Sequence, residues 1–341
     1  MTTDIENMFK DKVLGHPAGL FVLFFTEMWE RFSFYGMKAL LIFYLTKYHL
    51  FSDINGNLLI GSYAALVYAV PVIGGFIADK YLGFRKAIVF GGIMLVLGHM
   101  GMAYEGNAAT QSVTGEITRD NVALQVFYFS LALIILGVGF LKANISSLVG
   151  ELYAVGDKRR DSGFTIFYMG INLGSFLATI ICVWLGEAYG WSYGFGAAGI
   201  GMLIGLFIFL WGQDYLEGHA EPTSNFYKET KFNISYEYWA YISGIAMVIF
   251  SYLLIQNQEV VGNLLGGFGA ICVAFWLFYA LFKCSAEERD RLLVVGVLIL
   301  FSLIFCPTPF PKCTSELTSS KFQTPPRSRS MVSRERKVSV P

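Results

Sequence analysis

Long apolar segments alternate with short polar connections along most of the chain. Runs of this length match the roughly 20 residues that an α-helix needs to cross the hydrocarbon core of a bilayer. The pattern predicts eight membrane-spanning helices and the start of a ninth. Their expected bounds are 18–47, 58–79, 86–104, 122–151, 163–187, 193–213, 236–256, 262–283 and 292–306.

The connections between these segments differ in charge. Alternate connections, beginning with the amino terminus, hold thirteen Lys and Arg residues, while the intervening ones offer only Arg119 and Lys47. Cytoplasmic loops are enriched in Lys and Arg, so the amino terminus is predicted to be cytoplasmic and the protein to be a multi-pass protein of the cell (inner) membrane. No apolar core precedes Leu14, which predicts that there is no cleavable signal peptide.

Composition supports this class of protein. Apolar residues make up 55% and charged residues 15%, against about 25% charged in ordinary soluble domains. We expect an all-α polytopic membrane protein. Its expected parts are a cytoplasmic terminus (1–17), a six-helix bundle (18–213), a cytoplasmic linker with two extra transmembrane helices (214–291), the truncated start of a second bundle (292–305) and a tail (306–341).

The tail breaks the pattern. Residues 306–341 are rich in Ser, Pro, Lys and Arg and contain no apolar span, so they are interpreted as disordered, with a composition that suggests a shifted reading frame or a damaged gene.

Several function classes lack support. The five cysteines show no metal-ligand spacing, which predicts no metal site. No nucleophile with a base, catalytic carboxylate pair or phosphate loop is present, so an enzyme is not expected, and no basic patch with aromatic residues suggests nucleic acid. No cofactor is predicted.

The first segment carries unusual charge. At about 100° per residue, four of its side chains fall within about 60° of one another: Glu27, Arg31, Phe34 and Lys38. Glu30 and Tyr35 widen this face to about 140°. Each charge costs about 2.5 to 3.5 kcal/mol at mid-bilayer, so these groups must pair or face a wet cavity. The face is interpreted as a solute or proton path; the alternative is a set of charges that snorkel to a helix end.

Two later segments add polar groups. Lys142 follows an apolar run in the fourth segment, and a carboxylate of the first segment, Glu27 or Glu30, is its expected partner. The alternative is a lysine that reaches the interface. In the fifth segment Tyr168 and Asn172 share a face, while Gly170 and Gly174 form a strip for close helix packing.

The connection between the second and third segments reads Gly74-Gly-Phe-Ile-Ala-Asp79-Lys-Tyr-Leu-Gly83-Phe-Arg85-Lys86. It resembles the signature loop of the major facilitator superfamily, in which the Asp caps a helix start and pairs with cations. The resemblance implies a gating loop with these residues: Gly75, Asp79, Lys80, Gly83, Arg85 and Lys86. A plain positive-inside loop is the alternative.

Three motifs together resemble the proton-coupled oligopeptide transporter family of that superfamily, over about residues 15 to 305. They are E-x-x-E-R-F from Glu27 to Phe32, the Gly-rich segment from Gly74 to Gly83, and F-Y-M-G-I-N-L-G-S-F from Phe167 to Phe176. The resemblance implies a major-facilitator-type amino-terminal bundle with two linker helices of the bacterial type and a partial ninth helix. It also implies inward symport of di- and tripeptides with protons by alternating access.

The resemblance further implies residue roles. Proton coupling would fall to Glu27, Glu30, Arg31 and Lys142. Peptide binding would fall to Arg31, Phe34, Tyr35, Lys38, Tyr68, Lys142, Tyr168 and Asn172. Many members have Tyr at the place of Phe34 and Arg at the place of Lys38, so this chain lacks the hydroxyl at the first place and the forked guanidinium at the second.

The charges suggest how coupling would work. An ionised Glu27 or Glu30 would hold Arg31 and Lys142, and protonation would free these cations for a peptide carboxylate. We expect this chain alone to be a non-transporting amino-terminal portion. A membrane assembly or peptide-sensing protein, or a carrier of another anionic solute such as nitrate, is the alternative. Oligomeric state is not predicted.

Overall fold

The computed structural model describes residues 12–216, 218, 220–221, 230–231 and 234–305. It divides into two compact units, Met1–Gly266 and Gly267–Pro341. The first seven long helices lie in the first unit: α2 (Ala18–Phe43), α3 (Asp53–Ile77), α4 (Gly83–Met102), α5 (Asn121–Glu151), α6 (Arg160–Tyr189), α7 (Trp191–Trp211) and α8 (Tyr236–Gln256). The expected tail lies outside the described residues.

Short elements join these helices. Two π-helical turns, η1 (Tyr44–Tyr48) and η2 (Ala78–Leu82), extend α2 and α3, and a 3-10 turn, η3 (Gln213–Leu216), follows α7. Three antiparallel strand pairs each have two residues per strand. They are β1 (Lys12–Val13) with β2 (His16–Pro17), β3 (Thr110–Gln111) with β4 (Ile117–Thr118), and β5 (Thr230–Lys231) with β6 (Ile234–Ser235).

Two more helices follow. Helix α9 (Gln258–Phe282) crosses the boundary between the units, and α10 (Ala286–Phe305) belongs to the second unit. Within that unit the helices approach closely, because a Cβ added to Gly296 of α10 would lie 2.3 Å from the ring of Trp276 on α9.

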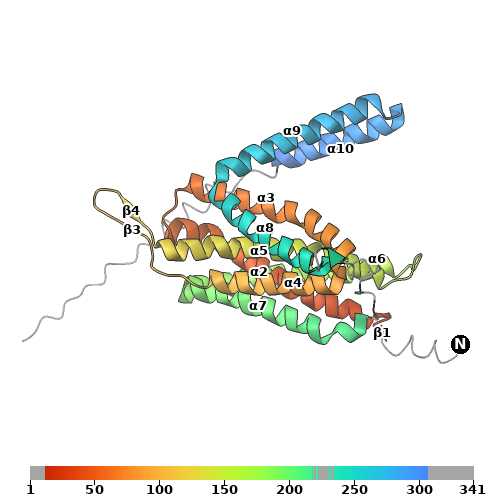
Figure 1. Ribbon diagram of the computed structural model, residues 1–341, viewed down its shortest axis with the longest axis horizontal. Coiled ribbons are helices and arrows are strands. Elements are labelled where there is room, and N and C mark those ends of the chain that lie inside the picture. Colours follow the sequence, from red (N-terminus) through yellow and green to blue (C-terminus); the bar gives the residue numbers. More distant parts are fainter. Residues whose placement is uncertain (1–11, 217, 219, 222–229, 232–233, 306–341) are drawn as a thin grey trace, which may run out of the picture. The chain divides into compact units, whose positions relative to one another are not determined.

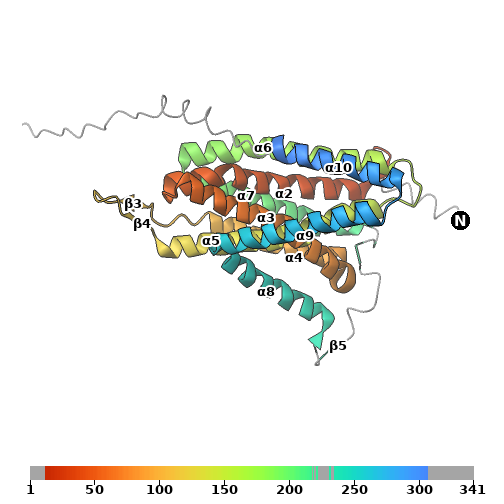
Figure 2. The ribbon, with the colours of Figure 1, turned by 90° about the horizontal axis from the view of Figure 1, so that it is seen from above.

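Helix α5 is the centre of the first unit. It contacts α3, α4 and α8, while α2 contacts α6 and α7 (Figures 1 and 2). Backbones meet directly where glycines face each other, since a Cβ on Gly74 of α3 would lie 2.4 Å from the carbonyl oxygen of Gly139 on α5. Small residues permit such close approach in lipid. This close packing fixes the position of α5, the helix that carries Lys142, relative to α3.

The predicted spans are confirmed as helices, with bounds that agree within several residues. Among the described residues, six stretches are long and apolar enough to cross a membrane, and one of them, Asp53–Met102, includes both α3 and α4. Helix α2 is not among the six, because its charged residues interrupt the apolar sequence. The chain is a multi-pass, all-α membrane protein.

The predicted loop between α3 and α4 is instead a helical turn. Asp79 and Lys80 lie in η2, and Gly83 begins α4 with a φ of +75°, a value that glycine adopts without strain. The expected capping role of Asp79 is wrong, since the residue before α4 is Leu82 and it makes no side-chain cap. The chain therefore passes from η2 to α4 through a single non-helical residue, Gly83.

Candidate functional site

Three charged side chains of α2 are buried together: Glu27, Glu30 and Arg31, which we call the α2 charge cluster. Their exposed fractions are 2%, 1% and 3%. Arg31 Nε lies 3.0 Å from Glu27 Oε1 and also forms an ion pair with Glu30. The helical spacing accounts for this geometry, since residues three and four apart share a face.

Helices α6 and α7 pack closely against α2 beside the α2 charge cluster. A Cβ on Gly174 would lie 2.1 Å from the carbonyl oxygen of Met28, and a Cβ on Gly201 would lie 2.5 Å from the ring of Phe32. The predicted Gly170–Gly174 strip therefore packs against α2. This packing leaves the α2 backbone little freedom to move relative to α6 and α7.

The cluster keeps unused hydrogen-bonding capacity. Glu27 Oε2, Glu30 Oε1 and Arg31 Nη2 are buried and have no hydrogen-bond partner among the described residues. A buried polar atom without a partner is costly. The two carboxylate oxygens can therefore accept, and the guanidinium can donate, a further hydrogen bond.

Lys142 on α5 faces this cluster. It interacts electrostatically with both Glu27 and Glu30, and its Nζ lies 5.2 Å from the centroid of the Tyr68 ring on α3. The lysine is thus an electrostatic neighbour of both carboxylates, but it forms no ion pair with either of them within the described residues. Two buried carboxylates are placed near two cations.

Aromatic side chains border the cluster along α2. The Arg31 guanidinium carbon lies 5.4 Å from the ring centroid of Phe34, which is buried, and Phe34 meets Tyr35 edge to face. Tyr35 is half-buried, whereas Lys38, one turn further on, is exposed. The charged face therefore runs from the buried cluster to an accessible cation.

The remaining candidate binding residues are accessible. Tyr68 is 63% exposed and Tyr168 is 59% exposed. Asn172 is also exposed, and its side-chain amide donates to the backbone oxygen of Tyr168 at 3.0 Å. With Lys38, these side chains come from α2, α3 and α6, and none is buried by another described residue.

One buried tyrosine near the cluster is absent from the predicted site. Tyr63 on α3 is 2% exposed and interacts electrostatically with Glu30 and Arg31. In the sequence it is one aromatic residue within a long apolar run, so spacing alone does not distinguish it. Only the packing of α3 reveals which way it points.

The predicted gating residues lie at the junction of α3, α4 and α8. Lys86 Nζ lies 2.6 Å from Glu237 Oε2 at the start of α8, and Arg85 Nε lies 2.5 Å from Glu221 Oε1. Gly75 lies inside α3, and Lys80 Nζ lies 5.4 Å from the Tyr81 ring centroid. Asp79 is exposed and forms no ion pair within the described part of the chain.

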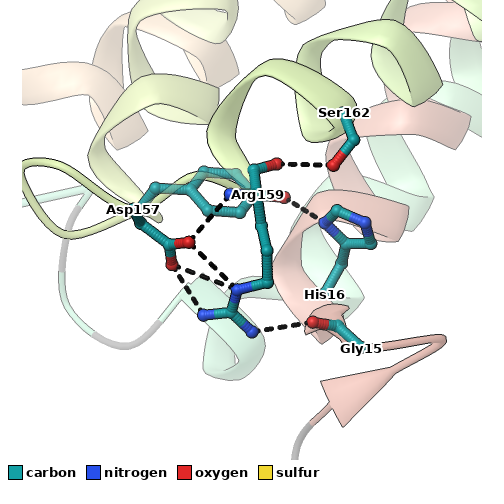
Figure 3. Close-up of polar contacts among 6 residues, drawn as sticks. Gly15, His16, Asp157, Arg159 and Ser162 are labelled. Atoms are coloured by element: carbon teal, nitrogen blue, oxygen red, sulfur yellow. Dashed lines mark hydrogen bonds and ion pairs between the residues drawn. The ribbon is translucent and has the colours of Figure 1, made fainter.

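A second polar contact joins the start of α2 to the α5–α6 turn. Arg159 pairs with Asp157 (Nη2 to Oδ2, 2.6 Å) and donates to the backbone oxygen of Gly15 at 2.8 Å (Figure 3). His16 Nδ1 lies 2.8 Å from the Tyr153 hydroxyl. Burial raises the pKa of Tyr153 to about 12, so this hydroxyl stays protonated near neutral pH.

At the other end of α2, His49 lies in the connection to α3. It is fully buried, and Arg119 Nε donates to its backbone oxygen at 2.7 Å. Burial, followed by the nearby Arg119 charge, lowers the pKa of His49 to about 4. The imidazole of His49 is therefore neutral in the folded protein near neutral pH.

Within the described residues, no group of three or more His, Cys, Asp or Glu is arranged to hold a metal ion. The site consists of paired acids and bases with aromatic neighbours, which suits the binding of protons and charged solutes.

Comparisons with known proteins agree with this arrangement. The chain is 46% identical over 204 residues to the uncharacterized transporter YclF of Bacillus subtilis, covering 57% of this chain and 37% of that protein. It is 34% identical over 309 residues to the di-/tripeptide transporter of Lactococcus lactis, covering 85% of this chain and 58% of that one. The chain thus spans between about a third and three fifths of the length of these relatives.

Solved structures share the fold. A crystal structure of a mutant peptide transporter POT in complex with alafosfalin matches with a TM-score of 0.66 and 36% identity, covering 85% of this chain and 57% of that one. The fold is thus of the major facilitator type, and these relatives are transporters, not enzymes. The model of the POT family matches residues 85–307, about two thirds of the sequence, and the chain therefore belongs to the POT family.

Proposed function

We propose that the chain supplies the amino-terminal bundle of a transporter that carries di- and tripeptides into the cell together with protons. The relative from Lactococcus lactis is a di-/tripeptide transporter, and a matching structure holds alafosfalin. The observation that carries the proposal is the α2 charge cluster, buried and facing Lys142.

The acids and bases provide a coupling mechanism. When Glu27 or Glu30 is ionised, it holds Arg31 and attracts Lys142. Protonation removes that attraction and leaves cations free to bind the carboxylate of a peptide. Proton binding and peptide binding then favour the same state, which thermodynamic coupling requires.

Side chains around the α2 charge cluster are proposed to bind the rest of the peptide. Tyr35, Tyr68 and Tyr168 offer ring faces and hydroxyls, and Asn172 offers an amide near the peptide's amino end. Phe34 packs under Arg31, and Lys38 is a second cation for a carboxylate.

The gating role is assigned to the junction of α3, α4 and α8. Gly75, Asp79, Lys80, Gly83, Arg85 and Lys86 are the residues proposed for it. The ion pair of Lys86 with Glu237 joins α4 to α8 and supports this assignment.

The alternation of cations among connections supports a cytoplasmic amino terminus in the cell (inner) membrane. We assign 18–213 to the bundle, 214–291 to the linker with two helices, and 292–305 to the start of a second bundle. Because four of the candidate binding side chains, Lys38, Tyr68, Tyr168 and Asn172, are exposed instead of enclosed, this chain alone is proposed not to transport.

The test uses an intact transporter made by joining residues 1–305 of this chain to the remaining helices of a relative. In proteoliposomes, Glu27→Gln or Glu30→Gln is expected to abolish pH-gradient-driven uptake of a labelled dipeptide while sparing counterflow exchange. Driven uptake that is unchanged in both variants would refute the proposal. Competition by nitrate instead of by dipeptides would identify an anion carrier.

This chain by itself provides a second test. Reconstituted alone, it is expected not to accumulate a labelled dipeptide under a pH gradient. Accumulation would show that this chain transports without a second bundle.

A further inference from the structure

Tyr63 is a buried side chain with an unused hydroxyl. It lies on α3 with 2% exposure, and its hydroxyl has no hydrogen-bond partner among the described residues. Buried hydroxyls are nearly always hydrogen-bonded. A polar partner for Tyr63 would therefore lower this cost.

The neighbours of Tyr63 identify that partner. Tyr63 interacts electrostatically with Glu30, Arg31 and Tyr68, and Glu30 Oε1 and Arg31 Nη2 are also buried without a hydrogen-bond partner in the described chain. A phenol hydroxyl donates one hydrogen bond and accepts others, an ionised carboxylate only accepts, and a guanidinium only donates. The hydroxyl of Tyr63 is thus complementary to both unused groups.

We propose that Tyr63 is a positioning residue of the α2 charge cluster, whose hydroxyl donates to ionised Glu30 and accepts from Arg31. This contact would hold the carboxylate in its charged, arginine-paired form until a proton arrives. The inference rests on the proposed proton coupling and adds a residue from a second helix to it. Tyr68 has a different neighbour, because its ring lies beneath Lys142.

Several other groups act on the same carboxylate and must be considered with Tyr63. Glu27 and Arg31 come from α2 and Lys142 comes from α5; Tyr35 of α2 acts on Arg31 instead. A hydrogen bond to the charged form favours that form. Loss of the hydroxyl is therefore expected to let Glu30 take up its proton at higher pH, with the other groups unchanged.

Tyr44 provides a matched control. It is 1% exposed and its hydroxyl also has no hydrogen-bond partner among the described residues. Its electrostatic neighbours are Tyr48 and Glu105 instead of the α2 charge cluster. Tyr44→Phe removes the same atom from an equally buried place and tests for a general effect of cavity formation.

The experiment is a pH titration of the purified chain in lipid nanodiscs, followed by infrared difference spectroscopy of protonated carboxyl groups. The Glu30 band is identified by its loss in Glu30→Gln. In Tyr63→Phe the midpoint of this band is expected to move upward by about one pH unit, which is a tenfold change in proton affinity. Tyr44→Phe is expected to leave the midpoint in place.

A second variant distinguishes loss of the hydrogen bond from damage to the fold. Replacement of Tyr63 by 3-fluorotyrosine keeps the shape and makes the hydroxyl a stronger donor, so the midpoint is expected to move downward. A Glu30 band that titrates at the same pH with both replacements would overturn the role of Tyr63 and leave proton coupling intact. A Glu30 band that never responds to pH would overturn both proposals.

Discussion

Arg31 is the cation that pairs with both carboxylates of the α2 charge cluster. It is 3% exposed and forms ion pairs with Glu27 and Glu30. Arg31→Met replaces the charged side chain with an apolar one of roughly similar length. It leaves two carboxylates buried without the cation that pairs directly with them, and only Lys142 remains nearby.

The expected cost follows from this geometry. Removing one partner of a buried ion pair costs about 3 to 5 kcal/mol, because the remaining charge is left uncompensated. The equilibrium constant for unfolding should therefore rise by between two and nearly four orders of magnitude, at about 1.4 kcal/mol for each tenfold change.

The loss should depend on pH. As pH falls, the two carboxylates of the variant take up protons and the uncompensated charge disappears, so the variant should recover stability in acid relative to the unsubstituted chain. The triple variant Glu27→Gln, Glu30→Gln and Arg31→Met carries no buried charge at these positions. It should be much more stable than the single variant.

Reversible unfolding in mixed detergent micelles, followed by tryptophan fluorescence, measures these differences. Lys38→Met is the matched control, since Lys38 is an exposed cation on the same helix, and its effect should be below about 1 kcal/mol. An Arg31→Met chain that is as stable as the unsubstituted one would refute the reasoning. A triple variant as unstable as the single one would do the same.

Three further predictions concern other parts of the first unit. Gly174→Ala should lower the free energy of unfolding by at least about 1 to 3 kcal/mol by forcing α6 away from α2, whereas Gly61→Ala, which meets nothing within 4 Å, should not; thermal unfolding of both variants decides this. Because the pKa of His49 is lowered to about 4 from 6.5, the unfolded chain binds more protons between these values, so stability should fall by about 2 kcal/mol from pH 7 to pH 5 through this group; His49→Phe should remove that part of the slope, and an unchanged slope would contradict it. A double-mutant cycle of Lys86→Met and Glu237→Gln should give a coupling energy of about 1 kcal/mol, and a coupling of zero would show that this ion pair does not hold α8 to α4.

The sequence predicts the helices well because their signal is local. Apolar runs of bilayer length mark α3 to α9 directly, and the acidic and basic residues of α2 lie three and four apart, so their shared face follows from helix geometry alone. The Gly170–Gly174 strip is also readable as a packing surface, although its partner, α2, is known only from the structure.

Other features depend on contacts between distant segments. The pairing of Lys86 with Glu237 joins residues 151 apart, and Tyr63 resembles any other apolar aromatic residue until α3 is packed. The segment from Ala78 to Leu82 reads as a loop because its polar residues match a loop composition, yet it forms a π-helical turn, and only Gly83 has a non-helical backbone. Local pattern cannot decide such cases.

Whether the charged face of α2 borders water inside the membrane is the central claim, and accessibility of single cysteines tests it most directly. Lys38→Cys and Phe25→Cys lie on opposite sides of α2, and both positions are exposed in the first unit. Each would be introduced into a chain whose five native cysteines are replaced by serine, and labelled in proteoliposomes. The account predicts that a charged, water-soluble thiol reagent modifies position 38 and spares position 25, which only a lipid-soluble reagent reaches. Modification of position 25 but not of position 38 by the charged reagent would contradict it.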